Sequence, residues 1–224
     1  MTKYWFMDIK VDAKTIIVFD LDDTLYNEIE FLKSAYKEIA QNLEKENWQS
    51  LYITMFSLYR NKIDVFAFMQ KHYKVAKSTL IKEYREHKPN IKLFEGVLET
   101  MQKIKKNKGK IGLITDGRQK TQTNKIEALG LTPFLDCIVI SEEIGSEKPH
   151  EKNYKLIESK FGKGTYYYIA DNFKKDFISP NIMGWETIGI IDNGLNIHND
   201  AYLYQDKKYR PKKIISSFKE LIIE

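Results

Sequence analysis

Apolar and polar positions follow two different patterns along this chain. Residues 15–19 read Thr-Ile-Ile-Val-Phe, a run typical of a strand that is buried on both faces. Residues 28–88 instead repeat apolar side chains at the i, i+3, i+4 and i+7 spacing of amphipathic helices. From residue 97 onward the two patterns alternate. The sequence therefore predicts a strand, then a block of helices, and then alternating helices and strands.

The helical block contains no strand and ends at Pro89. A crossover between parallel strands needs only about a dozen residues, so this block is too long to be one. We interpret it as an inserted second domain. The predicted boundaries are residues 27–89 for a small α-helical bundle, and residues 1–26 with 90–224 for the core.

The second half of the chain predicts an α/β fold, a parallel sheet with helices on both faces. The ends of the chain are less clear: residues 1–14 could add an edge strand, and residues 213–223 could add a short strand and a helix. The predicted strands after the first are residues 110–115, 137–141, 166–170 and 187–191, and the predicted helices between them are residues 97–108, 119–129, 151–161 and 174–183.

Composition narrows the classes of protein. The chain has 224 residues, 42% of them hydrophobic and 30% charged, which suits a globular protein with an ordinary core. Its net charge is +5, but no basic face interleaved with aromatic residues emerges, so we expect no nucleic-acid partner. A mild positive field would suit a small anionic substrate.

Cellular context follows from what the sequence lacks. The single cysteine, Cys137, rules out a disulfide within the chain. The N-terminal residues contain no apolar region of a signal peptide, and no apolar stretch approaches the ~20 residues of a membrane span. We therefore expect a cytoplasmic protein without membrane contact. It could be a monomer or a homodimer.

Acidic residues gather where the first strand ends. Asp20, Asp22 and Asp23 follow the apolar run within four residues, and unpaired buried carboxylates are strongly disfavoured. Mg²⁺ is a suitable partner because it prefers oxygen ligands. Asp20 could attack phosphorus as a nucleophile, and Asp22 could protonate the leaving oxygen and then activate water. Lys148 could steady both the nucleophile and the phosphoryl group.

Polar residues also follow the later strands, and ligands of open parallel sheets bind beyond the carboxyl ends of strands. Asp171 could complete a carboxylate set for Mg²⁺, and Asp176 could orient the metal shell. Thr115 offers a hydroxyl, while Asp116 and Gly117 offer backbone N–H groups that suit phosphate oxygens. Together these residues supply what phosphoryl transfer needs.

Four stretches in order resemble the four motifs of the haloacid dehalogenase superfamily: residues 20–25, 113–117, 141–149 and 170–176. The resemblance covers about residues 15–192. It implies a Rossmann-like core, a helical cap inserted after the first strand, and a Mg²⁺-dependent phosphatase that forms an aspartyl-phosphate.

The resemblance also implies roles. Asp20 becomes the nucleophile and Asp22 the general acid/base. Asp20, the backbone carbonyl of Asp22 and Asp171 become metal ligands with Asp176 in support, and Thr115 and Lys148 become phosphate contacts. Ala170 and Phe173 replace the usual Gly and Pro of the fourth motif. The presence of Asp22 favours phosphate esters over carbon–halogen bonds, because true dehalogenases of the superfamily lack this acid/base.

Several alternatives stay open. The same residues would serve a phosphosugar mutase, and a non-catalytic phosphate-binding protein would keep the fold. The substrate could be a sugar phosphate, a nucleoside monophosphate or a similar small metabolite. Asp23 and Thr24 are interpreted as turn residues, and Asn172 as either a turn residue or a metal-shell contact. Candidates for substrate recognition are Tyr26, Asn27, Arg60 and Arg118.

Overall fold

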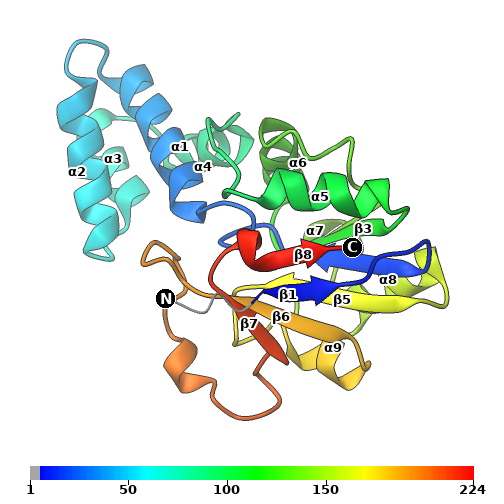
Figure 1. Cartoon of the computed structure of the whole chain (residues 1–224). Helices are drawn as coiled ribbons and strands as arrows, with labels where there is room; N and C mark the ends of the chain where they lie inside the picture. The colour runs from blue at the N-terminus through cyan, green and yellow to red at the C-terminus, as the bar shows by residue number, and fades with distance from the viewer. Residues whose placement is uncertain (1–5) are drawn as a thin grey trace, which may run out of the picture.

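The structure is a computed structural model and describes residues 6–224. Its centre is a parallel sheet of six strands in the order β4-β3-β2-β5-β6-β7, in which β2 lies between β3 and β5 (Figure 1). The α/β prediction is confirmed. The strands are β2 (Thr15–Phe19), β3 (Lys110–Thr115), β4 (Cys137–Ile140), β5 (Thr165–Ala170), β6 (Glu186–Ile190) and β7 (Lys213–Ile215).

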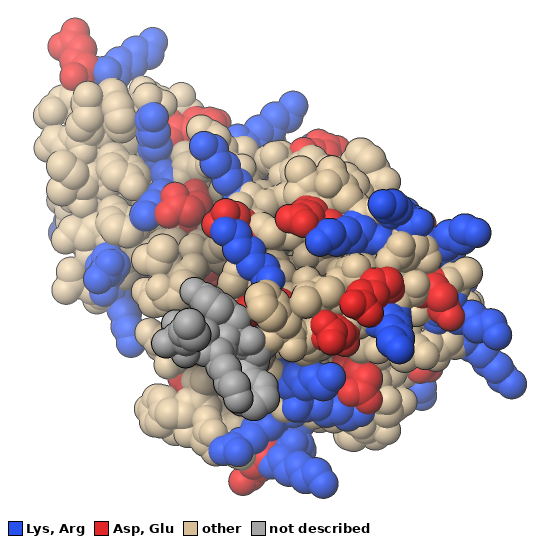
Figure 2. All heavy atoms as spheres, viewed as in Figure 1, with Lys and Arg blue, Asp and Glu red and all other residues tan. Residues whose placement is uncertain are grey.

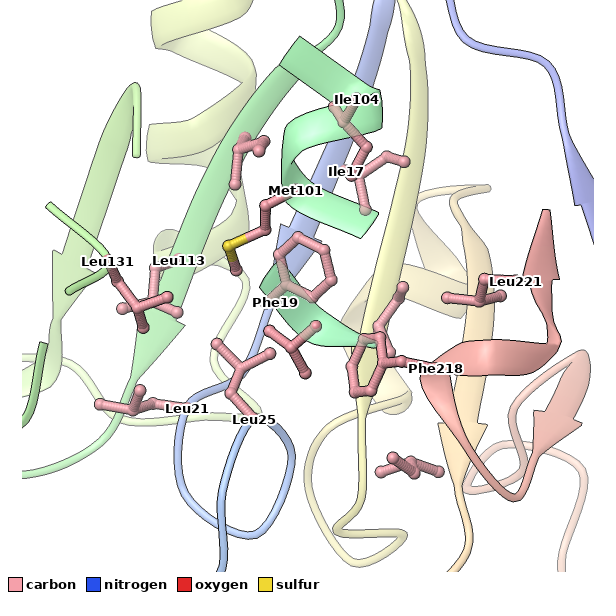
Figure 3. Close-up of a cluster of buried hydrophobic side chains, with 14 of the residues drawn as sticks. Ile17, Phe19, Leu21, Leu25, Met101, Ile104, Leu113, Leu131, Phe218 and Leu221 are labelled. Atoms are coloured by element: carbon pink, nitrogen blue, oxygen red, sulfur yellow. The ribbon is translucent and has the colours of Figure 1, made fainter. Parts of the chain in front are cut away.

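Strand β2 is buried along its whole length because helices cover both faces of the sheet. Successive strand residues point to opposite faces. Ile17 and Phe19 join the apolar cluster that includes residues of α5 (Val97–Lys106) and α6 (Gln119–Ala128), drawn in Figure 3. Ile16 and Val18 join a second cluster, with residues of α8 (Lys152–Phe161). This two-sided packing explains why the strand reads as apolar without alternation.

The inserted block forms a bundle beside the sheet (Figure 1). It has an apolar cluster of its own, which includes Leu32, Met55, Met69 and Leu80. The predicted division into two domains agrees with this separate cluster and stays a prediction. The bundle helices are α1 (Glu28–Leu43), α2 (Trp48–Arg60), α3 (Val65–Tyr73) and α4 (Lys77–Glu86).

The two ends of the chain pair with each other. β1 (Met7–Ile9) and β8 (Leu221–Ile223) form a separate two-stranded parallel sheet, so the lead does not extend the main sheet; residues 1–5 of that lead lie outside the described residues. The helix predicted for residues 216–223 is wrong. A 3-10 turn (Phe218–Glu220) and β8 take its place, because Leu221 and Ile223 alternate toward the core at the period of a strand.

Two further segments differ from expectation. The helix predicted for residues 174–183 is confined to α9 (Ile178–Ile182), so Asp176 lies in the turn before it rather than at its start. Directly after β4, a short helix, α7 (Ser141–Ile144), begins with no intervening loop.

Charged side chains are scattered over the face in Figure 2, where acidic residues lie among the lysines and arginines. Within residues 6–224, none of the helices has the length and apolar character that spanning a membrane requires.

The packing of the C-terminal segment against the central strand can be tested by mutation. Phe218 is 1% exposed, and its ring centroid lies 6.2 Å from that of Phe19 on the central strand. Phe218→Ala should lower the free energy of unfolding by about 3–5 kcal/mol, because it leaves a cavity between the chain end and the sheet. Denaturant unfolding measures this. Tyr202→Ala, at a residue that is 75% exposed, is the control and should change stability by less than about 0.5 kcal/mol. Equal effects would show that the chain end does not support the core.

Candidate active site

A cavity of about 150 Å³ lies at the carboxyl ends of the central strands. The structure brings five of the predicted residues to its wall and leaves Lys148, Asp176 and Gly117 outside its lining. Three residues that had not been predicted, Glu28, Lys175 and His198, also line it. The full lining is Asp20, Asp22, Asp23, Glu28, Thr115, Asp116, Asp171, Asn172, Lys175 and His198.

Lys148 lies buried behind Asp20 and holds it. Its Nζ is 2.5 Å from Asp20 Oδ1 and 2.7 Å from Asp176 Oδ1, and the side chains of all three are at least 93% buried. The two carboxylates raise the pKa of Lys148 well above its ordinary value, outweighing the opposite effect of burial. Asp20 therefore has one oxygen fixed by an ammonium group and its other oxygen near Thr24.

Negative charge exceeds positive charge on this side of the cavity. Carboxylate oxygens of Asp20, Asp171 and Asp176 lie within 4.8 Å of one another. Burial first, then neighbouring carboxylates, raise the pKa of Asp171 well above its usual range, and burial raises the pKa of Asp20 to about 7. When all three carboxylates are ionised, the single ammonium of Lys148 leaves two negative charges. The residues fit a divalent cation, held by Asp20 and Asp171, because Asp176 already binds Lys148 and the Asn172 N–H.

Asp22 faces the opposite side of the cavity and binds three donors. Lys125 Nζ lies 2.6 Å from its Oδ1, the Tyr26 hydroxyl donates to the same oxygen at 2.5 Å, and Gln122 Nε2 donates to Oδ2 at 2.9 Å. Burial alone would raise the pKa of Asp22. The charge of Lys125 and these hydrogen bonds outweigh burial, so the pKa is lowered. In this arrangement Asp22 is a carboxylate at neutral pH.

Glu28, the first residue of α1, is the second acid on that side. Its Oε1 lies 3.6 Å from Lys125 Nζ. Burial, then the charge of Asp22, raises the pKa of Glu28 to about 7, so its charge changes near neutral pH. The helical bundle thus begins at the wall of the cavity.

The expected phosphate contacts are only partly assembled. Thr115 lines the cavity, and its hydroxyl accepts a hydrogen bond from Gln122 Nε2 at 2.5 Å. Asp116 also lines it, although its carboxylate binds the Lys148 N–H and Lys175 Nζ. Gly117 does not line it: its N–H donates to Ser141 Oγ at 2.9 Å. That N–H therefore has a partner away from the cavity, and phosphate contact by Gly117 does not fit this arrangement.

A loop after β6 closes one edge of the site. Asn196 Nδ2 donates to Asp171 Oδ2 at 3.0 Å, and the Ile197 N–H donates to Asp23 Oδ2 at 2.7 Å. His198 follows and lines the cavity. The loop thus holds one oxygen of the candidate metal ligand Asp171.

A family model for haloacid dehalogenase-like hydrolases matches residues 17–190. The chain belongs to this family. The predicted relationship and the predicted hydrolase are confirmed.

Relatives of this hydrolase are moderately similar. It is 29% identical over 191 residues to the glyceraldehyde 3-phosphate phosphatase of Methanocaldococcus jannaschii, covering 78% of this chain and 84% of that one. It is 24% identical over 213 residues to the pyrophosphatase PpaX of Bacillus pumilus, covering 92% and 94%. A solved structure of a candidate HAD hydrolase, YfnB from Bacillus subtilis bound to magnesium, superimposes with a TM-score of 0.65 at 16% identity, covering 93% and 97%. At that identity the likeness shows the fold.

Several residues at the site of this haloacid dehalogenase-like hydrolase were not predicted from the sequence. Thr24 was interpreted as a turn residue, yet its hydroxyl lies 3.2 Å from both Asp20 Oδ2 and Asp171 Oδ1. Its position four residues after Asp20 was an available signal. Gln122 and Lys125 lie on α6 with no motif to mark them. Asn172 accepts a hydrogen bond from the Lys174 N–H, which is the turn role of the two considered.

The four candidates for substrate recognition fall into two groups by their contacts. Tyr26 is fully buried and binds Asp22, and Asn27 exchanges amide hydrogen bonds with Asn193. Arg118 instead pairs with Glu142 at 2.5 Å on the surface, and Arg60 is exposed at the end of α2. None of the four lines the cavity.

Proposed function

We propose that this protein is a Mg²⁺-dependent phosphatase that hydrolyses a small phosphorylated metabolite through an aspartyl-phosphate on Asp20. The family and the named relatives support the coarser statement, a hydrolase of phosphate esters. One observation carries the finer proposal: Asp20 lies between the Lys148 ammonium and the cavity that Asp22 and Thr115 also line.

In the first step, an Asp20 oxygen attacks phosphorus while the bond from phosphorus to the ester oxygen breaks. The leaving oxygen takes a proton from Asp22. Lys148 keeps the Asp20 carboxylate oriented, and the Thr115 hydroxyl contacts a phosphoryl oxygen. A dianionic phosphate beside Asp22 favours the protonated acid that this step needs, because a nearby negative charge raises a carboxyl pKa.

In the second step, Asp22 takes a proton from water, and the water oxygen attacks phosphorus. The bond between phosphorus and Asp20 breaks, and inorganic phosphate leaves. The lowered pKa of Asp22 suits this basic role. The same carboxyl group thus gives and then takes one proton, which leaves the enzyme unchanged after each turnover.

Asp20 and Asp171 would hold the Mg²⁺, supported by Thr24, Asn196 and the backbone carbonyl of Asp22. When bound, the cation neutralises charge on the transferring phosphoryl group. The two uncompensated negative charges of the cluster support this assignment. YfnB, a structural neighbour, was solved bound to magnesium.

The size of the cavity supports a small substrate. At about 150 Å³ it is far smaller than the roughly 300–1,000 Å³ pockets that hold drug-sized ligands. One relative acts on glyceraldehyde 3-phosphate according to its name, and another on pyrophosphate. We therefore favour compact anions of this size over nucleotides.

Replacing the nucleophile tests the chemistry. Asp20→Asn should lower phosphate release from p-nitrophenyl phosphate with Mg²⁺ by at least ~10³-fold, because an amide cannot form the aspartyl-phosphate. Asp8→Asn, at an exposed residue of β1, is the matched control and should keep full activity. Release of free phosphate also separates a phosphatase from a mutase. Full activity in Asp20→Asn would exclude the proposed nucleophile.

Mg²⁺ binding should depend on pH. Burial raises the pKa of Asp20 from 3.8 to about 7, so below that pH the cation must displace a proton, and above it the carboxylate is ready. Affinity should be at least about tenfold weaker at pH 6 than at pH 8 for each proton displaced. Titration calorimetry in two buffers of different ionisation enthalpy measures affinity and proton release together. Asp171→Asn should abolish binding. Equal affinity at both pH values, with no proton release, would show that no carboxyl group of the site loses a proton when the cation binds in this range.

A substrate panel tests the preference for small anions. We expect kcat/KM for glyceraldehyde 3-phosphate or pyrophosphate to exceed that for uridine monophosphate by at least about tenfold, because the cavity does not accommodate a nucleoside. Phosphate release at fixed Mg²⁺ and pH provides the measurement. A preference for the nucleotide would overturn the proposed substrate class and leave the nucleophile assignment standing.

A further inference from the structure

Helix α6 carries polar side chains on the face that it turns inward. Thr121, Gln122, Asn124 and Lys125 are all buried, with Lys125 2% exposed. A helix that covers a sheet normally turns an apolar stripe inward. Burial of a lysine and two amides is costly unless each finds partners, so the partners of these side chains indicate what the residues do.

The contacts divide the four residues into two pairs. The Thr121 hydroxyl donates to the Arg85 carbonyl, and Asn124 Nδ2 donates to the carbonyls of Glu86 and His87, so this pair anchors the end of the bundle. Gln122 and Lys125 instead bind Asp22, which lines the cavity. Anchoring the bundle does not account for the second pair.

Both residues of the second pair bind Asp22. Lys125 Nζ lies 2.6 Å from Oδ1, and Gln122 Nε2 donates to Oδ2 at 2.9 Å. The same Gln122 nitrogen donates to Thr115 Oγ1 at 2.5 Å. One amide group therefore joins the candidate acid/base to the candidate phosphate contact. Each carboxylate oxygen of Asp22 has its own donor from α6, which fixes the rotation of the group.

Lys125 also reaches the bundle. Its ammonium lies 3.6 Å from Glu28 Oε1 and 4.7 Å from the centroid of the Phe31 ring, and both residues belong to α1. Lys125 is thus enclosed by Asp22 on the core side and by α1 on the bundle side. Its position depends on both parts of the chain.

We propose that Lys125 and Gln122 are positioning residues that hold the Asp22 carboxyl group at the angle and distance needed to exchange a proton with the bound phosphate ester. The inference rests on the proposed acid–base role of Asp22. General acid–base catalysis contributes about 10²–10⁴-fold, and that contribution depends on the geometry of the proton donor. Neither residue contacts the reacting atoms; each acts through Asp22.

The test compares two leaving groups. Leaving-group loss from p-nitrophenyl phosphate needs little protonation, whereas loss of an alkoxide from glycerol phosphate needs a well-placed acid. The parameter kcat/KM reports steps up to that loss, so hydrolysis of the aspartyl-phosphate does not mask the effect. Lys125→Met keeps the unbranched side chain up to the position of the ammonium group and removes the donor. It should lower the alkyl-to-aryl ratio of kcat/KM by at least about tenfold.

Gln122→Met is the second variant and covers the case in which the lysine variant does not fold. It should lower the ratio in the same direction. Thr121→Val is the matched control on the same helix, because it removes the hydrogen bond to Arg85 without touching Asp22. It should lower thermal stability and leave the ratio unchanged.

A double-mutant cycle locates the effect. With the aryl ester, kcat includes the second step, in which Asp22 acts as base. If Lys125 acts through Asp22, then Lys125→Met should change kcat by less than about twofold in the Asp22→Asn background. Two results together support the proposal. The alkyl-to-aryl ratio of kcat/KM falls in both Met variants, and neither Met substitution lowers kcat further once Asp22 is replaced by Asn.

Two results would overturn it, and they differ. An active wild type with a lowered ratio in Asp22→Asn, but an unchanged ratio in both Met variants, would show that Lys125 and Gln122 are only structural. An unchanged ratio in Asp22→Asn would remove the acid–base role of Asp22, and this inference with it. A wild-type protein that releases no phosphate from either ester would instead contradict the proposed function.

Discussion

The ammonium group of Lys148, buried between Asp20 and Asp176, is the interaction on which the site depends. It neutralises one acid at the end of β2 and another in the turn after β5, at 2.5 Å and 2.7 Å. The Lys148 N–H also donates to Asp116 beyond β3. A single residue thus fixes three strand ends relative to one another. Removing it would leave two buried carboxylates with hydrogen bonds but without a positive charge beside them, which costs more than the pair contributes.

A second lysine, Lys125, holds Asp22 at the opposite wall of the cavity, and the two walls differ in their charge. On the Lys148 side, three carboxylates share one ammonium, and the two remaining negative charges match a divalent cation. On the Lys125 side, Asp22 and Glu28 share one ammonium and leave a single negative charge. Burial and the charge of Asp22 raise the pKa of Glu28 to about 7, so a proton on Glu28 balances that charge near neutral pH. The first wall gathers enough carboxylates for a metal, and the second holds Asp22 among its donors.

The sequence predicted what lies close to the strand ends, because acids directly after a buried apolar run must lie at the edge of the sheet where ligands bind. Asp20, Thr115 and Asp171 each come within one residue of a strand end, and their meeting follows from the parallel sheet. Lys125 could not be predicted in this way, since a lysine within a polar helix is expected to face solvent, and only the packing of α1 against it shows otherwise. The prediction of a helix in the C-terminal segment failed for a related reason. A run as short as Leu221–Ile223 fits a helix or a strand, and its partner, β1, lies more than two hundred residues earlier.

Insertion of the bundle between β2 and β3 connects it to the candidate acid/base. Glu28 lies six positions after Asp22, and Tyr26 between them donates to the Asp22 carboxylate. The Phe94 N–H donates to the Leu25 carbonyl, so the segment that leaves the bundle is bonded to the segment that enters it. α6 then holds the returning segment through Thr121 and Asn124 on the face that also presents Lys125. The bundle is also packed against a donor of Asp22, through the contacts of Lys125 with Glu28 and Phe31. The bundle, whose first helical residue lines the cavity, is thereby connected to the group that we propose to transfer the proton.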